Sequence, residues 1–319
     1  MRVASLVVLA IVLVASTGRA VSIWDGARDP RTARVSRVLI EAERARQPRE
    51  FSLDTLASLP LFDGQLAMHA ALILQEAGGE ALGDPDVDYF LGDCLVVENR
   101  GRTEDEEGRR LLLRALVAAP DSPRAAHAWF QIAIASDRLG DFKETRRAYT
   151  EALRVEWDKN HRAAIYMNRG EAAMALGELR EAQSDFETAL VLADDSEVHA
   201  LAAWDLAVTL SRQEDLPDAL RRAWEAWQYR FRDLQGNVIN ALDLPTVSFT
   251  PDYNLFYYRA LGNMAAAEHA ENAEARKDRL ELAMADLRRY LMEARPARDR
   301  WIGNVELALV WCRRRLGKR

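Results

Sequence analysis

The side chains that most often do chemistry in proteins are few in this chain, and they stand apart from one another. The five histidines occur singly, and the two cysteines, Cys94 and Cys312, lie 218 residues apart, so no thiolate zinc site can form. Gly-x-Ser-x-Gly, the P-loop, Gly-x-Gly-x-x-Gly and His-Glu-x-x-His are all absent from the sequence. We therefore expect no catalytic residue, no bound metal and no cofactor, and we predict that the protein is not an enzyme.

One acidic run has the spacing of a calcium loop. Asp84, Asp86 and Asp88 alternate as the first ligands of such a loop do, but Tyr89 stands where the sharp-turn glycine belongs and Leu95 where the bidentate glutamate belongs. A simpler explanation is that Asp84 caps a helix whose first residue is a proline. The run is interpreted as a helix start.

Composition limits the classes of protein to consider. The 319 residues are 49% hydrophobic, with only 16 Gly and 10 Pro, which is typical of a folded helical chain with a sizeable core. The formal net charge of -7 makes sequence-independent nucleic-acid binding a poor expectation, and we predict no nucleic-acid partner. The 39 Arg against 4 Lys favour a GC-rich bacterial genome over a binding surface.

The first 20 residues are typical of a secretory signal peptide. An apolar run from Val3 to Ala15 is followed by small residues that suit cleavage after Ala20. At about 1.5 Å per residue the run reaches only about 20 Å, short of the roughly 30 Å core of a bilayer. We expect export to a bacterial periplasm. The alternative is an uncleaved leader that tethers the protein to the inner membrane, which would be its only membrane contact.

A period of 37 residues organises the rest of the chain. Turn residues at 140–142, 177–179 and 214–216 recur at this offset, and so do the apolar or small residues on either side of them. Each unit therefore predicts two helices around a short turn. The matching columns are Trp129, Tyr166 and Ala203 before the turn, and Tyr149, Phe186 and Ala223, then Ala152, Ala189 and Ala226, after it.

This pattern resembles the tetratricopeptide repeat (TPR) family, although each unit is three residues longer than the usual 34. The resemblance implies an all-α fold, an α-solenoid of stacked antiparallel helix pairs. We expect about five pairs and a C-terminal capping helix at 299–317, with an N-terminal helical cap at 21–80 and the repeat domain at 81–319. In such an elongated fold the cysteines should be two buried thiols.

Helix geometry separates two stripes on the first helix of each unit. The reference positions of the three units are Trp129, Tyr166 and Ala203. Residues three, four and seven positions after each reference form a core stripe along the helix. Residues one, five and eight positions after it form a second stripe, roughly 115° away around the helix axis. In the TPR family this second stripe faces the concave groove. Its members here are Phe130, Ile134, Asp137, Met167, Glu171, Met174, Trp204, Val208 and Ser211, joined in the last unit by Arg259 and Asn263.

An apolar groove floor usually marks a contact site. The sequence thus favours a non-catalytic scaffold or adaptor of the bacterial cell envelope that binds an amphipathic or extended apolar segment of a protein partner. The alternative function is a membrane-tethered structural subunit of an envelope machine of the secretion, pilus or motility type. The sequence leaves it equally open whether the groove binds a partner or is filled by the chain's own apolar connection at 237–250. Arg259 and Asn263 resemble half of a clamp for a terminal carboxylate. The cations of the C-terminal tail, Arg313, Arg314, Arg315, Lys318 and Arg319, are typical of a basic patch for anionic lipid, but the partial negative charge of a helix end is the simpler explanation.

Overall fold

The computed structural model describes residues 81, 83, 85–98, 101–122, 124–156, 158–232, 236–244, 247 and 249–317. The predicted leader at 1–20 and cap at 21–80 lie outside the described residues, so they stay predictions. The chain divides into two compact units, Met1–Ala172 and Ala173–Arg319, whose boundary falls inside helix α9. Each unit is described by itself.

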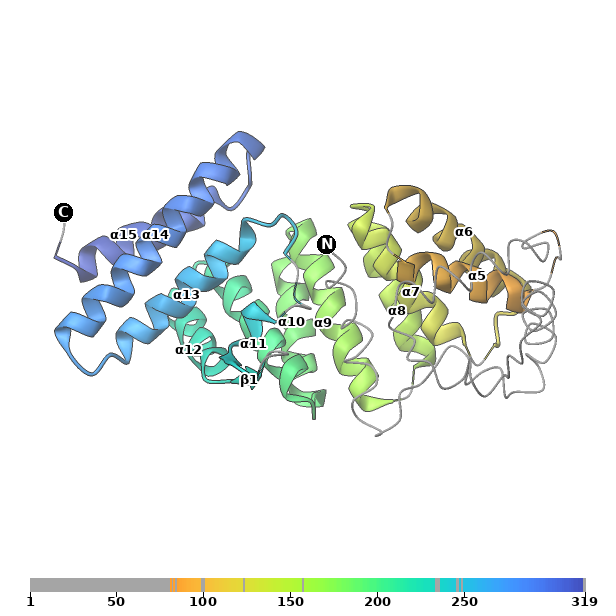
Figure 1. The fold of residues 1–319 in the computed structure, drawn as a ribbon, viewed down its shortest axis with the longest axis horizontal. Coiled ribbons are helices and arrows are strands. Elements are labelled where there is room, and N and C mark those ends of the chain that lie inside the picture. Colours follow the sequence, from red (N-terminus) through yellow and green to blue (C-terminus); the bar gives the residue numbers. More distant parts are fainter. Residues whose placement is uncertain are drawn as a thin grey trace. The chain divides into compact units, whose positions relative to one another are not determined.

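Unit 1 holds consecutive helices that pack on one another. They are α5 (Pro85–Glu98), α6 (Arg102–Ala118), α7 (Ala125–Arg138), α8 (Phe142–Val155) and the first part of α9 (Lys159–Leu176). Helix α5 packs on α6, α6 on α7, and α7 on α8 (Figure 1). Phe90, Leu111 and Ile132 are fully buried between them. The core of unit 1 therefore runs along the helix pairs rather than around a sheet.

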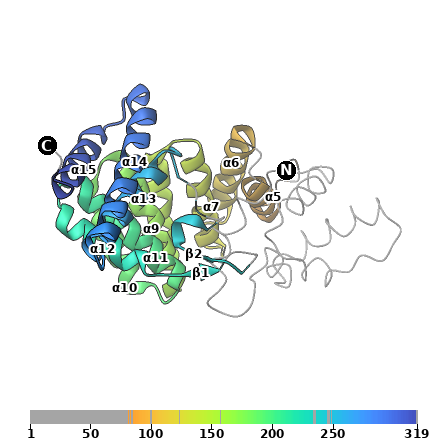
Figure 2. The same ribbon diagram turned by 60° about the vertical axis from the view of Figure 1, so that its left-hand side comes forward.

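Unit 2 continues the same pattern. After the end of α9 it holds α10 (Leu179–Leu192), α11 (Ser196–Arg212), α12 (Leu216–Trp227), α13 (Asn254–Glu268), α14 (Ala273–Ala297) and α15 (Ile302–Arg315). Consecutive helices pack on one another from α10 to α15 (Figure 2). A short antiparallel pair, β1 (Phe231–Arg232) and β2 (Val238–Ile239), and a 3-10 turn, η4 (Ala241–Asp243), lie between α12 and α13. Over the described residues the fold is the predicted one, an all-α, TPR-like solenoid of five helix pairs and a terminal helix.

The 37-residue period is visible in the backbone of the turns. At three successive turns the residue with a left-handed backbone is Gly140 (φ 77°), Gly177 (φ 82°) and Glu214 (φ 68°). The next N–H in each turn donates to a carbonyl five residues earlier at 2.9 Å, from Asp141 to Ser136, from Glu178 to Ala173 and from Asp215 to Leu210. These are Schellman-type helix ends. The repeat predicted from side-chain types is confirmed at the level of hydrogen bonds.

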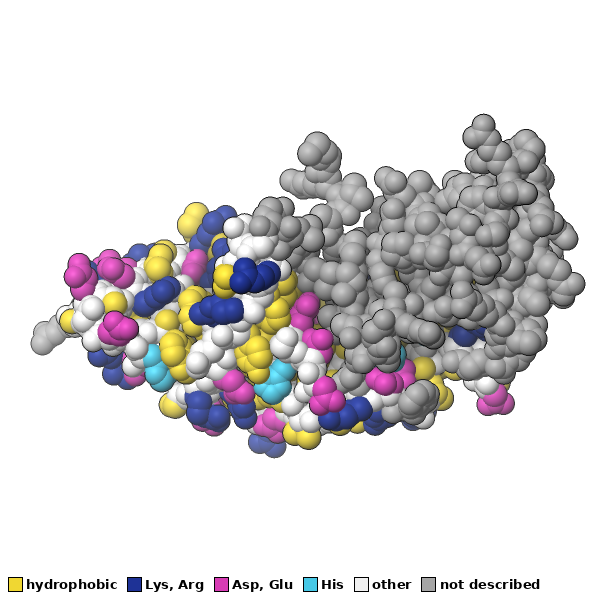
Figure 3. All heavy atoms as spheres, turned by 60° about the horizontal axis from the view of Figure 1, so that its bottom comes forward, with side chains coloured by type: hydrophobic (Ala, Val, Ile, Leu, Met, Phe, Trp, Pro, Cys, Tyr) yellow, Lys and Arg dark blue, Asp and Glu magenta, His cyan; other side chains and the backbone are white. Residues whose placement is uncertain are grey.

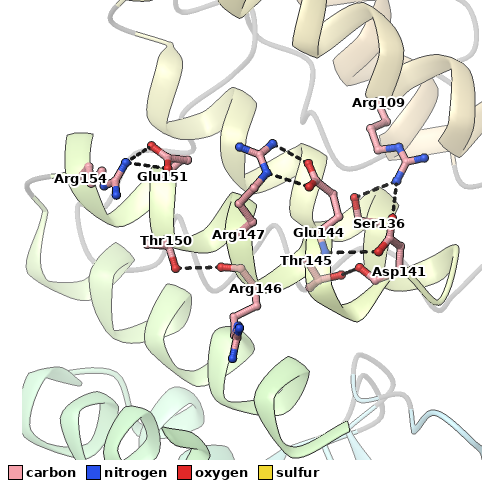
Figure 4. A network of polar contacts seen from close by, with 10 residues as sticks. All are labelled: Arg109, Ser136, Asp141, Glu144, Thr145, Arg146, Arg147, Thr150, Glu151 and Arg154. Atoms are coloured by element: carbon pink, nitrogen blue, oxygen red, sulfur yellow. Dashed lines mark hydrogen bonds and ion pairs between the residues drawn. The ribbon is translucent and has the colours of Figure 1, made fainter. Parts of the chain in front are cut away.

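Polar side chains fix one of these turns to the preceding helix in unit 1. Arg109 of α6 donates from Nη1 to the Ser136 hydroxyl and to Oδ2 of Asp141, both at 3.4 Å (Figure 4). Asp141 also caps α8, since its Oδ1 accepts from the Glu144 N–H at 3.3 Å. Glu144 in turn pairs with Arg147 one helical turn later, at 2.6 Å. One arginine thus connects the α5–α6 pair to the turn of the next pair.

Candidate functional site

The predicted stripe lies partly at the surface in unit 1. Phe130 and Met167 are buried, at 4% and 6% exposure, whereas Ile134 and Asp137 are half-buried and Glu171 is exposed. The Phe130 ring makes an edge-to-face contact with Tyr149 of α8, with centroids 5.6 Å apart. The stripe therefore has an apolar floor and an accessible, mainly acidic rim.

The electrostatics of this site centre on Tyr149. Burial raises the pKa of its hydroxyl well above the ordinary value, and the nearby carboxylates of Asp137 and Glu171 raise that pKa further, while a hydrogen bond with Asn168 lowers it. Burial also raises the pKa of Asp137 from 3.8 to about 6, partly opposed by Arg138. Two carboxylates from α7 and α9 thus act on the same hydroxyl. One of them titrates close to neutral pH.

In unit 2 the same stripe is closed. Met174, Trp204, Val208 and Ser211 are all buried, with Trp204 and Val208 at 0% exposure, so the expectation of an open groove is wrong for this part of the chain. The Trp204 and Trp227 rings stand edge to face against the small Gly262 of α13, where a Cβ would lie within 2.7 Å of the Trp204 ring.

Polar contacts seal the same helix face in unit 2. Ser211 and the Tyr257 hydroxyl share a buried hydrogen bond of 2.7 Å, and the Thr209 hydroxyl lies 3.3 Å from the sulfur of Met174. These partners come from α13 and α9. The stripe is apolar here because it forms contacts between helices of one chain.

The connection at 237–250 contributes to the closure. Turn η4 packs against α11 and α13, and its Ala241 and Leu242 are buried. Farther along the connection the Phe249 ring lies edge to face with Tyr258, with centroids 5.1 Å apart. Of the two alternatives left open by the sequence, the described part of this connection favours filling by the chain itself in unit 2.

The two polar residues of the last unit also have partners within the chain. Arg259 donates to Oδ1 of Asp243 in η4 at 2.8 Å, and Asn263 accepts from Arg279 of α14 at 3.3 Å. Burial raises the pKa of Asp286, beside Arg259 and Asn263, and both neighbours oppose that shift. The resemblance of Arg259 and Asn263 to half of a carboxylate clamp therefore has a structural explanation, an ion-pair cluster that fixes the connection.

Sequence reasoning missed a column of buried polar residues. Gln131, Asn168 and Asp205 lie 37 residues apart and are 5–6% exposed. Asn168 hydrogen-bonds Tyr149, and Asp205 accepts from the Tyr258 hydroxyl at 2.7 Å. The sequence does contain a polar residue two positions after each of Trp129, Tyr166 and Ala203, and this recurrence could have revealed the column. A buried polar group needs a partner, so this column specifies which helices lie together.

The cysteines and histidines form no reactive cluster within the described residues. Cys94 and Cys312 are free and buried, as predicted, and burial raises the pKa of the Cys312 thiol to about 12. Within the described ranges, no three His, Cys, Asp or Glu side chains are placed to hold a metal ion. No helix in the same ranges combines the length and the apolar character needed to cross a bilayer.

Comparison with known proteins adds only distant similarities. No family model and no curated protein sequence matches the chain. Among solved structures, the P58(IPK) TPR domain is similar over 90% of this chain and 76% of its own, at 14% identity and a TM-score of 0.36. Human IFIT1, solved as a dimer with m7Gppp-AAAA, is similar over 93% of this chain and 64% of its own, at 16% identity and a TM-score of 0.40. The fold assignment therefore rests on the repeat geometry of the chain itself.

Proposed function

We propose that the protein is a non-catalytic interaction scaffold that binds an amphipathic segment of a protein partner at the stripe in unit 1. One observation carries this proposal. Ile134, Asp137 and Glu171 stay accessible around an apolar floor, whereas the equivalent residues of unit 2 are sealed. A preformed helical surface loses little ordering entropy on binding, which suits recognition by shape.

The charge of the rim narrows the kind of segment. Asp137 and Glu171 border the floor, so the partner segment should place apolar side chains over Ile134 and a lysine or arginine near the two carboxylates. Because the pKa of Asp137 is about 6, its charge is lost as the pH falls through that value. Binding to a cationic segment should weaken over the same range. A peptide lacking cations would show no such dependence.

The cellular setting is part of the proposal. The apolar run at 3–15 and the small residues up to Ala20 support export, and the arginine bias supports a bacterial source. We place the scaffold in the bacterial cell envelope, in the periplasm after cleavage of the leader. N-terminal sequencing of the mature protein tests this placement, because a first residue near Val21 requires export and cleavage.

Site-specific photocrosslinking in intact cells tests the interaction. A photoreactive residue at Ile134 and another at Glu171 should capture the same partner, and Glu171→Lys combined with the Ile134 probe should reduce that capture about tenfold, as a loss of about 1.4 kcal/mol would. The matched control is a probe at Val117 of α6, which is 83% exposed and outside the stripe. Equal capture from Val117, or capture unaffected by the charge reversal, would refute this assignment of the binding surface.

A further inference from the structure

The outer face of helix α15 carries exposed apolar side chains. Its inner face, with Val305, Ala308 and Cys312 buried, packs on α14. On the opposite side Leu307 is 56% exposed and Val310 is 39% exposed. Exposed apolar side chains that lie together on one helix face are typical of a contact site. At about 100° per residue, Gly303, Leu307, Val310 and Arg314 fall within an arc of roughly 60°.

The charge at this end of the chain is opposite in sign to that of the rest. Residues 273–319 contain 13 Lys or Arg against 7 Asp or Glu, whereas residues 1–272 contain 30 against 43. Arg313 and Arg314 are exposed, and no ion pair holds either of them in the part of the chain that the structure describes. Arg315 is held by Glu268 at 3.2 Å and lies over the Trp311 ring. The free cations thus flank the apolar stripe at its C-terminal end.

Apolar side chains and free cations on one helix face fit an anionic lipid surface. Leucine and valine gain free energy at the boundary between headgroups and acyl chains, while arginines bind the phosphates beside them. A nucleic acid would use the arginines and leave Leu307 and Val310 in water. We propose that the outer face of α15 docks the protein on an anionic phospholipid surface. This contact is separate from the stripe in unit 1 and from the leader.

Exposed apolar side chains elsewhere in the described chain differ from those of α15. Figure 3 shows one face of the molecule, on which basic, acidic and hydrophobic side chains are intermingled over the described part of the chain. Other exposed valines lack the free arginine pair. Val191 in α10, for example, is 80% exposed, and the nearest charged residue in sequence is Asp194. Such a site offers apolar area without cations.

The experiment is vesicle flotation of the full chain. Vesicles of pure phosphatidylcholine are compared with vesicles in which about a third of the lipid is phosphatidylglycerol, at about 0.05 M and about 0.5 M salt, where screening differs strongly. Binding to pure phosphatidylcholine measures membrane contact through the apolar run at 3–15, and this amount is subtracted from the binding to the mixed vesicles. The remaining binding should require the anionic lipid and should fall at high salt. Arg313→Gln with Arg314→Gln should weaken it by more than tenfold, at roughly fivefold for each arginine.

Two further variants separate lipid from other anionic partners. Leu307→Gln with Val310→Gln should weaken vesicle binding several-fold, whereas the control Val117→Gln with Val191→Gln should leave it unchanged. Gly303 has open space where a Cβ would stand, so Gly303→Leu should fit and should strengthen binding by enlarging the stripe. The proposal is overturned if no anionic-lipid-dependent binding is seen, or if the control weakens it equally. Binding of an RNA oligonucleotide that needs the arginines but not Leu307 and Val310 would also overturn it.

Discussion

Helices α7 and α11 occupy equivalent places in their pairs, two periods apart, yet they differ in how much of their surface remains accessible. Every residue from 202 to 212 in α11 is buried, whereas Ile134 and Asp137 of α7 are only half-buried. The excess cover in unit 2 comes from η4 and from the C-terminal segment. Asn304 donates to the carbonyls of Ser211 and Arg212 at 3.2 and 3.1 Å, which satisfies the end of α11.

The same segment also reaches the end of α9. Arg300 donates from Nη1 to the Leu176 carbonyl at 2.9 Å, and the Arg212 guanidinium lies 4.7 Å from the centre of the Trp301 ring. In unit 1 the side chain that hydrogen-bonds a repeat turn is Arg109, which comes from the preceding helix. Elements outside the repeat therefore decide which copy of the stripe stays open. Repeat periodicity decides only where the stripe lies.

Two buried carboxylates, one in each unit, differ in the strength of their contacts. Asp205 of α11 accepts from the Tyr258 hydroxyl at 2.7 Å. Asp93 of α5 is fully buried, and its partners are Gln131 and His127 of α7. Nδ1 of His127 lies 3.8 Å from Oδ1 of Asp93 and 2.7 Å from the Tyr89 hydroxyl. Asp205 therefore has a short hydrogen bond, whereas the ion-pair distance at Asp93 is long.

The largest effect is expected at the sealed stripe. Trp204→Ala should lower the free energy of unfolding by about 3–5 kcal/mol, because it removes a fully buried ring packed on Trp227 and α13. The half-buried Ile134→Ala should cost only about 1 kcal/mol, since less apolar area returns to water. Urea unfolding followed by circular dichroism measures both. Equal costs at the two positions would contradict the difference between the open and the sealed stripe.

A smaller effect is expected at the Tyr258–Asp205 pair. Tyr258→Phe should destabilise the protein by about 1–3 kcal/mol, because it removes one donor from the buried Asp205 carboxylate. The matched control is Tyr166→Phe, whose hydroxyl is only 3.4 Å from Arg162 at a partly exposed site. That change should stay within about 0.5 kcal/mol. If thermal unfolding shows no difference between the two variants, the Tyr258–Asp205 bond does not stabilise unit 2.

Local geometry explains why so much of the fold could be predicted. The turns at Gly140, Gly177 and Glu214 repeat the same hydrogen bonds, and each is set by a few adjacent residues. Ala152 and Ala189, one period apart, are both fully buried, at positions where a larger side chain would separate the helices. Such short-range requirements recur in the sequence and can be found by periodicity alone.

The candidate site depends on residues that lie outside the period. The helix phase of the stripe followed from the sequence, but Trp204 is apolar because Trp227 of α12 and Gly262 of α13 pack against its ring. An apolar residue has the same identity in an open groove and in a closed helix contact, so the pattern could not distinguish them. Arg259 and Asn263 are polar because Asp243 and Arg279 face them. Those pairings join segments whose spacing follows no repeat.

The smallest effect, and the one of opposite sign, is expected at Asp93. Burial raises the pKa of this carboxyl above 3.8, and both His127 and a hydrogen bond with Gln131 oppose the shift. The contribution of Asp93 to stability is thus complete below pH 3.8 and is lost as the pH rises through its pKa in the folded state. Asp93→Asn should therefore stabilise the protein at neutral pH, on the order of 1 kcal/mol, because it removes a buried charge whose desolvation outweighs its contacts with His127 and Gln131.

The gain from Asp93→Asn should shrink as the solution is acidified, since the wild-type carboxyl then becomes neutral too. The control is Asp88→Asn on the same helix, which removes the ion pair with Arg114 and should destabilise the protein at neutral pH. Urea midpoints measured from pH 4 to pH 8 test both changes. If Asp93→Asn destabilised the protein at every pH, Asp93 would be acting as a charged partner. The contrast between the weak contacts of Asp93 and the short hydrogen bond of Asp205 would then be wrong.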